Sequence, residues 1–402
     1  MILFLAIINI LLPIIGMYRS YKNKHMIFFI WLIISYYSIT SIVSLTFSDN
    51  LQFSEYVRET YVVNMLLCIV GFLLSDFVFN KKSMGPIDIG ILTNSSLKQL
   101  LSIIEGLFWI SLVATFFELK VQDYNTYNTG TGAGWFQVIF QSTSCIIVRF
   151  LRKEQWLKLG LASFLVLAIV SFVGVRSLMY FIVMPIGLYL IYEKILHAKS
   201  IKRALKIVFP MLIVAFLVVY AVNMLRFGES KLPETELTTI SLTVIEKGVV
   251  VNQYTMSALH YITGFLTPII NALNKLGLGI PDPSTYLLPS VPRLNAVVTQ
   301  NVSDVAYLEN AAHMPGTIFH DLWYCWGKYA PIAAFFLYWF LLKVSTLFQK
   351  NAISFFCFSS IFGWHFYMLL RGSVDTCSSG VSYSILLSFL LYYYLSRKIT
   401  LR

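Results

Sequence analysis

Long apolar stretches separated by short polar connections dominate the pattern of this chain of 402 residues. A helix of about 20 apolar residues is long enough to cross a hydrocarbon core of about 30 Å. Eleven stretches of suitable length predict membrane-spanning helices at 1–18, 26–47, 56–80, 98–119, 133–150, 156–173, 175–193, 204–226, 329–348, 352–371 and 378–396. The expected fold class is therefore an all-α polytopic membrane protein.

The composition agrees with this pattern, since 57% of the residues are hydrophobic and only 12% are charged. Soluble domains carry about 25% charged residues. A net charge of +11 would indicate a nucleic-acid partner in a soluble protein. Here basic residues that anchor cytoplasmic loops explain the charge better, so we expect a lipid bilayer and no nucleic acid as partner.

The basic residues also predict an orientation. With the N-terminus outside, 20 of the 30 Lys and Arg residues fall in or beside the cytoplasmic connections and tail. Long loops count little in this comparison, and one long outer loop, 227–328, holds five of the other ten. We therefore expect a periplasmic N-terminus and a cytoplasmic C-terminus.

The predicted spans divide the chain into three parts. Residues 1–226 form an N-terminal bundle of about eight spans, 227–328 a large periplasmic loop with interfacial helices, and 329–402 about three C-terminal helices. Within the loop, residues 249–280 are apolar but interrupted by polar side chains and Pro268. Loops of this length are uncommon as mere connections, so we expect this loop to carry function.

Four arginines are placed at or beyond the outer ends of the predicted spans. Arg176 lies between the sixth and seventh spans, Arg226 ends the eighth, Arg371 ends the tenth, and Arg293 lies in the long loop. The planar guanidinium binds phosphate through paired donors. The arrangement favours a phosphate-binding cluster, provided that the helices are neighbours. The alternative is that each arginine only anchors a helix end at the interface.

The long loop also holds candidate bases. His260, His313 and His320 lie there, with Asp321 beside the last. A sugar hydroxyl that attacks an activated carbon needs a positioned base, for which histidine and carboxylates are usual. His313 precedes the turn-forming sequence MPGT, although a structural histidine remains the alternative. His365 in the tenth span fits a buried polar residue.

Several familiar motifs are absent from the sequence. It contains no Walker A loop, GxGxxG, HExxH or DxD pair, so we expect neither a metal nor a cofactor. The five cysteines lack metal-ligand spacing, while a Cys325–Cys377 disulfide stays open. The predicted spans have almost no ionisable residue near their midplanes, which argues against a proton-coupled carrier.

The layout resembles that of the O-antigen polymerases, the bacterial oligosaccharide repeat-unit polymerases. The features that carry the resemblance are about eleven spans, a large late outer loop, GVRS after a tight outer hairpin, an Arg before the loop and another near the last spans. These motifs are short and degenerate.

The resemblance implies a GT-C-like glycosyltransferase of the bacterial inner membrane. Its substrate would be an undecaprenyl-pyrophosphate-linked oligosaccharide, and the growing glycan would pass to the non-reducing end of a new repeat. A chain-length regulator would be a further membrane partner. By position, Arg176, Arg226, Arg293 and Arg371 would hold pyrophosphate. His313, or else His320 or Asp321, would deprotonate the acceptor. Loop aromatics would stack on sugars, or else form an interfacial belt: Tyr261, Tyr286, Tyr307, Trp323, Tyr324 and Trp326.

Two other functions remain open on the sequence. An O-antigen ligase would share the architecture and use lipid A core as acceptor. A flippase of lipid-linked sugar should carry cations deep along a central cavity, whereas these arginines lie towards one face.

Overall fold

The computed structural model describes residues 2–47, 52–88, 97–121, 135–173, 177–198, 317–370 and 374–400, together with isolated positions between 206 and 279. Every regular element in these ranges is helical. In chain order they are α1 (Ile2–Lys22), α2 (Phe28–Phe47), α3 (Glu55–Phe79), α4 (Lys98–Val121), α6 (Trp135–Thr143), α7 (Ile146–Arg152), α8 (Trp156–Val173), α9 (Ser177–Leu190), the π-turn η4 (Ile191–Leu196), α16 (Ile318–Trp326), the 3-10 turn η5 (Gly327–Tyr329), α17 (Ala330–Phe348), α18 (Ala352–Leu370) and α19 (Val374–Thr400).

These helices confirm the all-helical fold class. Six helical segments of the described chain are long and apolar enough to cross a membrane: Phe4–Lys22, Phe28–Leu45, Glu55–Phe79, Lys98–Leu119, Leu178–Leu196 and Gly327–Phe348. A further apolar helix, Trp156–Val170, is shorter than these six. The predicted span 204–226 lies outside the described residues except for Lys206, so the count of eleven stays a prediction.

The helices alternate in direction between two ends of the bundle. At one end α1, α3, α7 and α17 finish while α2, α8 and α18 begin. The connections at this end hold basic residues: Lys24, Lys81, Lys82, Lys153 and Lys350. We call it the basic end. At the opposite, distal end α2 and α18 finish and α3, α9 and α17 begin.

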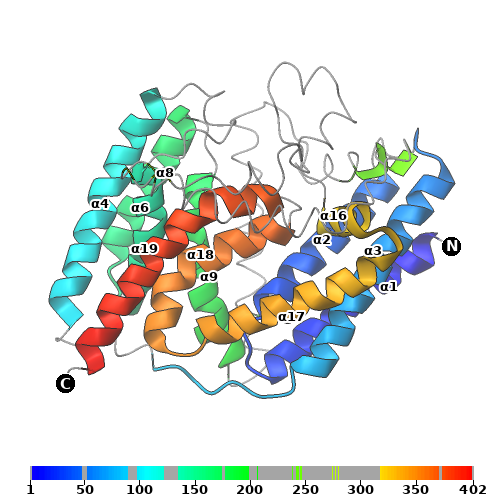
Figure 1. The fold of residues 1–402 in the computed structure, drawn as a ribbon, viewed down its shortest axis with the longest axis horizontal. Helices are drawn as coiled ribbons and strands as arrows, with labels where there is room; N and C mark the ends of the chain where they lie inside the picture. Colours follow the sequence, from blue (N-terminus) through cyan, green and yellow to red (C-terminus); the bar gives the residue numbers. More distant parts are fainter. Residues whose placement is uncertain are drawn as a thin grey trace.

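Two groups of helices are visible in Figure 1, one with α1, α2, α3, α16 and α17, the other with α4, α6, α8, α9, α18 and α19. Small residues allow close packing between helices, as in many membrane bundles. A Cβ atom at Gly71 of α3 would overlap the carbonyl oxygen of Pro331 in α17. Likewise a Cβ atom at Gly363 of α18 would overlap Met184 of α9.

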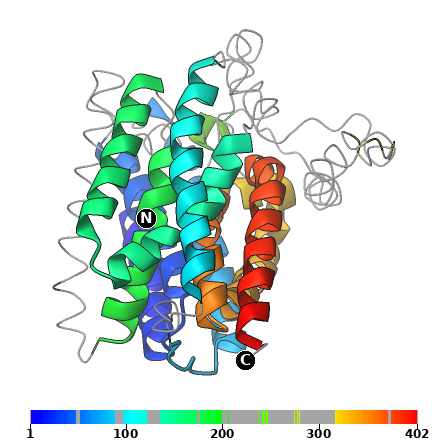
Figure 2. The ribbon, with the colours of Figure 1, turned by 90° about the vertical axis from the view of Figure 1, so that its left-hand side faces the viewer.

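The outer surface of the bundle is strongly apolar. On α8, Leu157 is 87% and Phe164 67% exposed, and Ile110 on the neighbouring α4 is 64% exposed. Figure 2 turns the side with α4 and α8 towards the viewer. Large apolar surfaces of this kind are rare on soluble monomers and suit contact with lipid chains. The exposed faces therefore support a membrane protein.

The fifth predicted span, 133–150, is not one continuous helix. Its helix α6 ends at Thr143 and α7 begins at Ile146. Around this break the hydroxyls of Ser142, Thr143 and Ser144 donate to the carbonyls of Val138, Ile139 and Gln141. Such local side-chain bonds compete with the regular helical pattern, which gives a physical reason for the interruption.

Candidate functional site

Aromatic side chains join α9 and α18 near the distal end. The rings of Tyr180 and Tyr367 are stacked with centroids 5.0 Å apart, and their hydroxyl oxygens are 3.4 Å apart. Trp364 lies 4.9 Å from Tyr180, and Tyr37 of α2 is 6.5 Å from Tyr367, both measured between ring centroids. The start of α9 and the end of α18 are therefore neighbours.

This neighbourhood matters because of the sequence positions beside it. Arg176 is the residue before α9, and Arg371 is the residue after α18. Each is four positions from one of the two stacked tyrosines, which corresponds to about one helical turn of 5.4 Å. The two arginines lie outside the described residues. The backbone segments that lead to them meet at Tyr180 and Tyr367.

A polar cluster lies deeper between α6, α18 and α19. The side-chain amide nitrogen of Gln141 is 3.3 Å from Nε2 of His365, and Ser384 donates to the amide oxygen of Gln141 at 2.7 Å. The hydroxyl of Ser360 donates to the backbone carbonyl of Gln141, also at 2.7 Å. Because an amide nitrogen is a donor, Nε2 of His365 accepts and the ring is neutral. His365 is thus a hydrogen-bonded residue inside the bundle.

A third cluster fixes the first turn of α16 near the distal end. The Tyr61 hydroxyl of α3 is 3.0 Å from the Ser41 hydroxyl of α2 and 3.3 Å from the hydroxyl of Thr317. Thr317 is the residue before α16, and all three side chains are buried. A further hydroxyl, that of Thr238, donates to Ser41 at 3.5 Å. This cluster ties α16 to α2 and α3.

The predicted site residues are only partly within the structure. His320 and Asp321 lie in α16, although their side chains are outside the described part. Arg226, Arg293 and His313 lie outside the described residues, as do Arg176 and Arg371. The proposed grouping of these side chains is therefore still a prediction. The side chains of Cys325 and Cys377 are likewise outside the described part.

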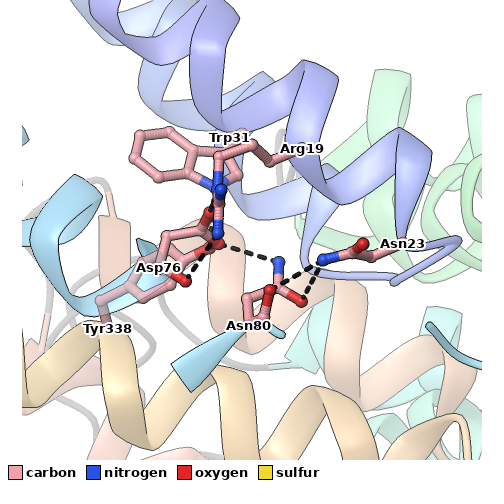
Figure 3. A network of polar contacts seen from close by, with 6 residues as sticks. All are labelled: Arg19, Asn23, Trp31, Asp76, Asn80 and Tyr338. Carbon is pink, nitrogen blue, oxygen red and sulfur yellow. Dashed lines mark hydrogen bonds and ion pairs between the residues drawn. The ribbon is translucent and has the colours of Figure 1, made fainter. Parts of the chain in front are cut away.

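A buried polar network lies at the basic end (Figure 3). The carboxylate of Asp76, with no exposed surface, accepts from Nε of Arg19 at 2.7 Å and from the amide of Asn80 at 2.9 Å. The Tyr338 hydroxyl also donates to Asp76, and the Trp31 indole donates to Tyr338 at 2.7 Å. Both carboxylate oxygens are satisfied, so this network fastens α1, α2, α3 and α17.

A buried histidine secures the turn between α1 and α2. Nδ1 of His25 accepts the backbone N–H of Ile27 at 3.1 Å, while Nε2 is 3.1 Å from the Thr346 hydroxyl of α17. Gln349 also bonds this turn, accepting from the N–H of Met26 and donating to the carbonyl of Lys24. Burial lowers the pKa of His25 to about 4, so the ring is neutral at pH 7.

Comparison with protein-family models, curated proteins and solved structures finds no match for this chain. Among the described residues no group of three or more His, Cys, Asp or Glu side chains could hold a metal ion.

Sequence reasoning missed the tyrosine pair, although a signal was present. Tyr180 and Tyr367 stand at equal distances from Arg176 and Arg371 in the sequence. That symmetry becomes meaningful once α9 and α18 are known to be neighbours. The Arg19–Asp76 pair was also missed, because its two residues are 57 positions apart and no local pattern connects them.

Proposed function

We propose that this protein is a membrane-embedded glycosyltransferase that polymerises lipid-linked oligosaccharide repeat units. The donor would be a glycan on undecaprenyl pyrophosphate, and the acceptor would be the non-reducing end of a new lipid-linked repeat. The reaction would take place on the periplasmic side of a bacterial inner membrane, in a GT-C-like fold. No nucleotide or metal is required by this chemistry.

The observation that carries the proposal is the stacked pair Tyr180–Tyr367. It joins the start of α9, which Arg176 precedes, to the end of α18, which Arg371 follows. A phosphate site shared by the two arginines requires that these helix ends be neighbours. Arginines on neighbouring helix ends can neutralise a pyrophosphate leaving group through paired hydrogen bonds. If each arginine only anchored its own helix end at the interface, α9 and α18 would not have to be neighbours.

The proposed step balances without any further reactant. An acceptor hydroxyl oxygen attacks the anomeric carbon, and the bond from that carbon to the pyrophosphate oxygen breaks. The electron pair leaves on the pyrophosphate, whose charge the arginines hold. The hydroxyl proton passes to His313, or to His320 or Asp321 on α16, acting as general base. The attachment of α16 through Thr317 to Tyr61 supports a fixed position for its first turn.

Arginine variants test the proposal. Purified protein in lipid would be given a synthetic pyrophosphate-linked repeat, and chain extension would be followed by mass spectrometry. Arg176→Ala and Arg371→Ala should each lower the extension rate by about 10²-fold or more, as removal of one transition-state donor does elsewhere. Arg→Lys at either position should also be impaired, because the planar fork is lost.

The matched control is Lys328→Gln, which removes an exposed positive charge near the distal end. It should leave the rate unchanged. Full extension by both arginine variants would refute the phosphate site. Transfer to a lipid A core acceptor in place of the repeat would identify the protein as a ligase.

A further inference from the structure

A buried guanidinium near the basic end has incomplete hydrogen bonding. Arg149, in α7, is 6% exposed, and its Nε and Nη1 atoms have no hydrogen-bond partner among the described residues. The nearest carboxylate oxygen, on Glu105 of α4, is 3.7 Å from Nη1. A buried charge with unsatisfied donors is costly, because water has been removed and nothing replaces it. The site therefore favours an additional acceptor.

The same carboxylate is shared with a second cation. Lys158, near the start of α8, makes a close ion pair with Oε1 of Glu105, and its ammonium also lies 5.6 Å from the centre of the Phe150 ring. Two positive groups therefore surround one negative group. Arg152 does not add to this local charge, because its ion pair is with Glu193. The Arg149–Lys158 cluster carries one uncompensated positive charge and suits an anion.

The surroundings indicate the source of that anion. The Lys158 side chain is 42% exposed, so the cluster opens towards the outside of the bundle. The large exposed side chains along α4 and α8 near it are apolar: Ile103, Leu107, Leu157 and Leu161. Trp156, 60% exposed at the start of α8, suits the boundary between chains and headgroups. Figure 2 shows α4 and α8 next to each other along this side.

We infer that Arg149 and Lys158 bind the phosphodiester of an anionic membrane lipid, with its acyl chains along the exposed faces of α4 and α8. Phosphate can accept hydrogen bonds from the exposed ammonium of Lys158 and supplies the negative charge that Glu105 alone does not provide for the two cations. Basic pockets between helices at a membrane face bind anionic headgroups in this way. Free phosphate could bind the same two cations, but it has no acyl chains to contact the adjoining apolar faces of α4 and α8. The inference does not depend on the proposed function.

Titration with short-chain lipids tests this site. The intact protein, purified in a neutral detergent, would be titrated separately with dihexanoylphosphatidylglycerol, dihexanoylphosphatidylcholine and inorganic phosphate. The rise in Tm with concentration gives an apparent Kd for each. The wild type should bind the phosphatidylglycerol about tenfold or more tightly than the phosphatidylcholine, as expected for one good charged hydrogen bond.

Three variants locate the effect. Arg149→Gln and Lys158→Gln should each lose the preference for phosphatidylglycerol. Lys153→Gln, which removes an exposed lysine directly after α7, should keep the preference for phosphatidylglycerol. If Arg149→Gln does not fold, Lys158→Gln decides, because its side chain is partly exposed.

Equal binding of the two lipids by the wild type, or an unchanged preference in Lys158→Gln, would overturn the site. Stabilisation by inorganic phosphate at the same concentrations as phosphatidylglycerol would overturn the assignment to a lipid and identify a free anion as the ligand.

Discussion

Replacing Asp76 by asparagine removes the one negative charge from the network at the basic end. The carboxylate accepts from Arg19, Asn80 and Tyr338, and Asp76 has no exposed surface (Figure 3). In the variant, one oxygen becomes an NH₂ group. Whichever oxygen is replaced, a donor then faces a donor, and Arg19 loses its ion pair.

The size of the effect follows from these contacts. Removing one partner of a buried ion pair costs about 3–5 kcal/mol, chiefly because the other charge is left buried. The Arg19 side chain is 25% exposed and can regain some water. We therefore expect a loss near the lower end, about 3 kcal/mol in the free energy of unfolding.

Denaturant unfolding in mixed micelles, followed by tryptophan fluorescence, would measure this loss. Lys81→Gln is the matched control, since it removes an exposed charge five positions further along the chain and should cost less than about 0.5 kcal/mol. Arg19→Gln combined with Asp76→Asn should cost clearly less than the sum of the two single variants. Equal stability of Asp76→Asn and the control, or strict additivity, would refute the structural role of the pair.

Three further predictions concern pH, packing and hydrogen bonding. The pKa of His25 is lowered from 6.5 to about 4, so the contribution of the neutral ring to the free energy of unfolding is complete above pH 6.5. It falls between pH 6.5 and 4, by up to about 3 kcal/mol. In thermal unfolding, the stability of His25→Gln should therefore depend less steeply on pH than that of the wild type over this range. Gly71→Val should lower stability by about 1–3 kcal/mol through overlap with Pro331, whereas Gly106→Val, where a Cβ atom meets no neighbour, should have little packing cost in the same unfolding assay. Tyr338→Phe should cost about 1–3 kcal/mol in chemical unfolding, because it removes the acceptor of a buried indole N–H, and a cost below about 0.5 kcal/mol would contradict this.

The length of the apolar stretches predicted the described helices well. The stretch 156–173 coincides with α8, and 329–348 differs from α17 by one residue. These positions follow from apolar runs that any hydropathy pattern reveals. The break in 133–150 was not predicted, because it depends on which carbonyls the hydroxyls of Ser142 and Thr143 reach.

The polar contacts were largely beyond sequence reasoning. Tyr61 and Thr317 are separated by 256 positions, and their meeting depends on how α3 and α16 pack. Arg149 could be recognised as a residue of a basic connection, but not as a buried cation with missing partners. The condition for the arginine cluster, that the helices be neighbours, could be stated from sequence. The structure shows that α9 and α18 are neighbours, and the grouping of Arg176 with Arg371 stays a prediction.

The measurement that tests the central claim most directly is a gel of surface polysaccharide from a host in which this gene has been deleted. The proposed function predicts that the ladder of long chains collapses to core plus a single repeat, and that it returns with the wild-type gene but not with Arg176→Ala. An unchanged ladder would contradict the account. Long polymer that accumulates on its lipid carrier while the core stays bare would instead identify the ligase.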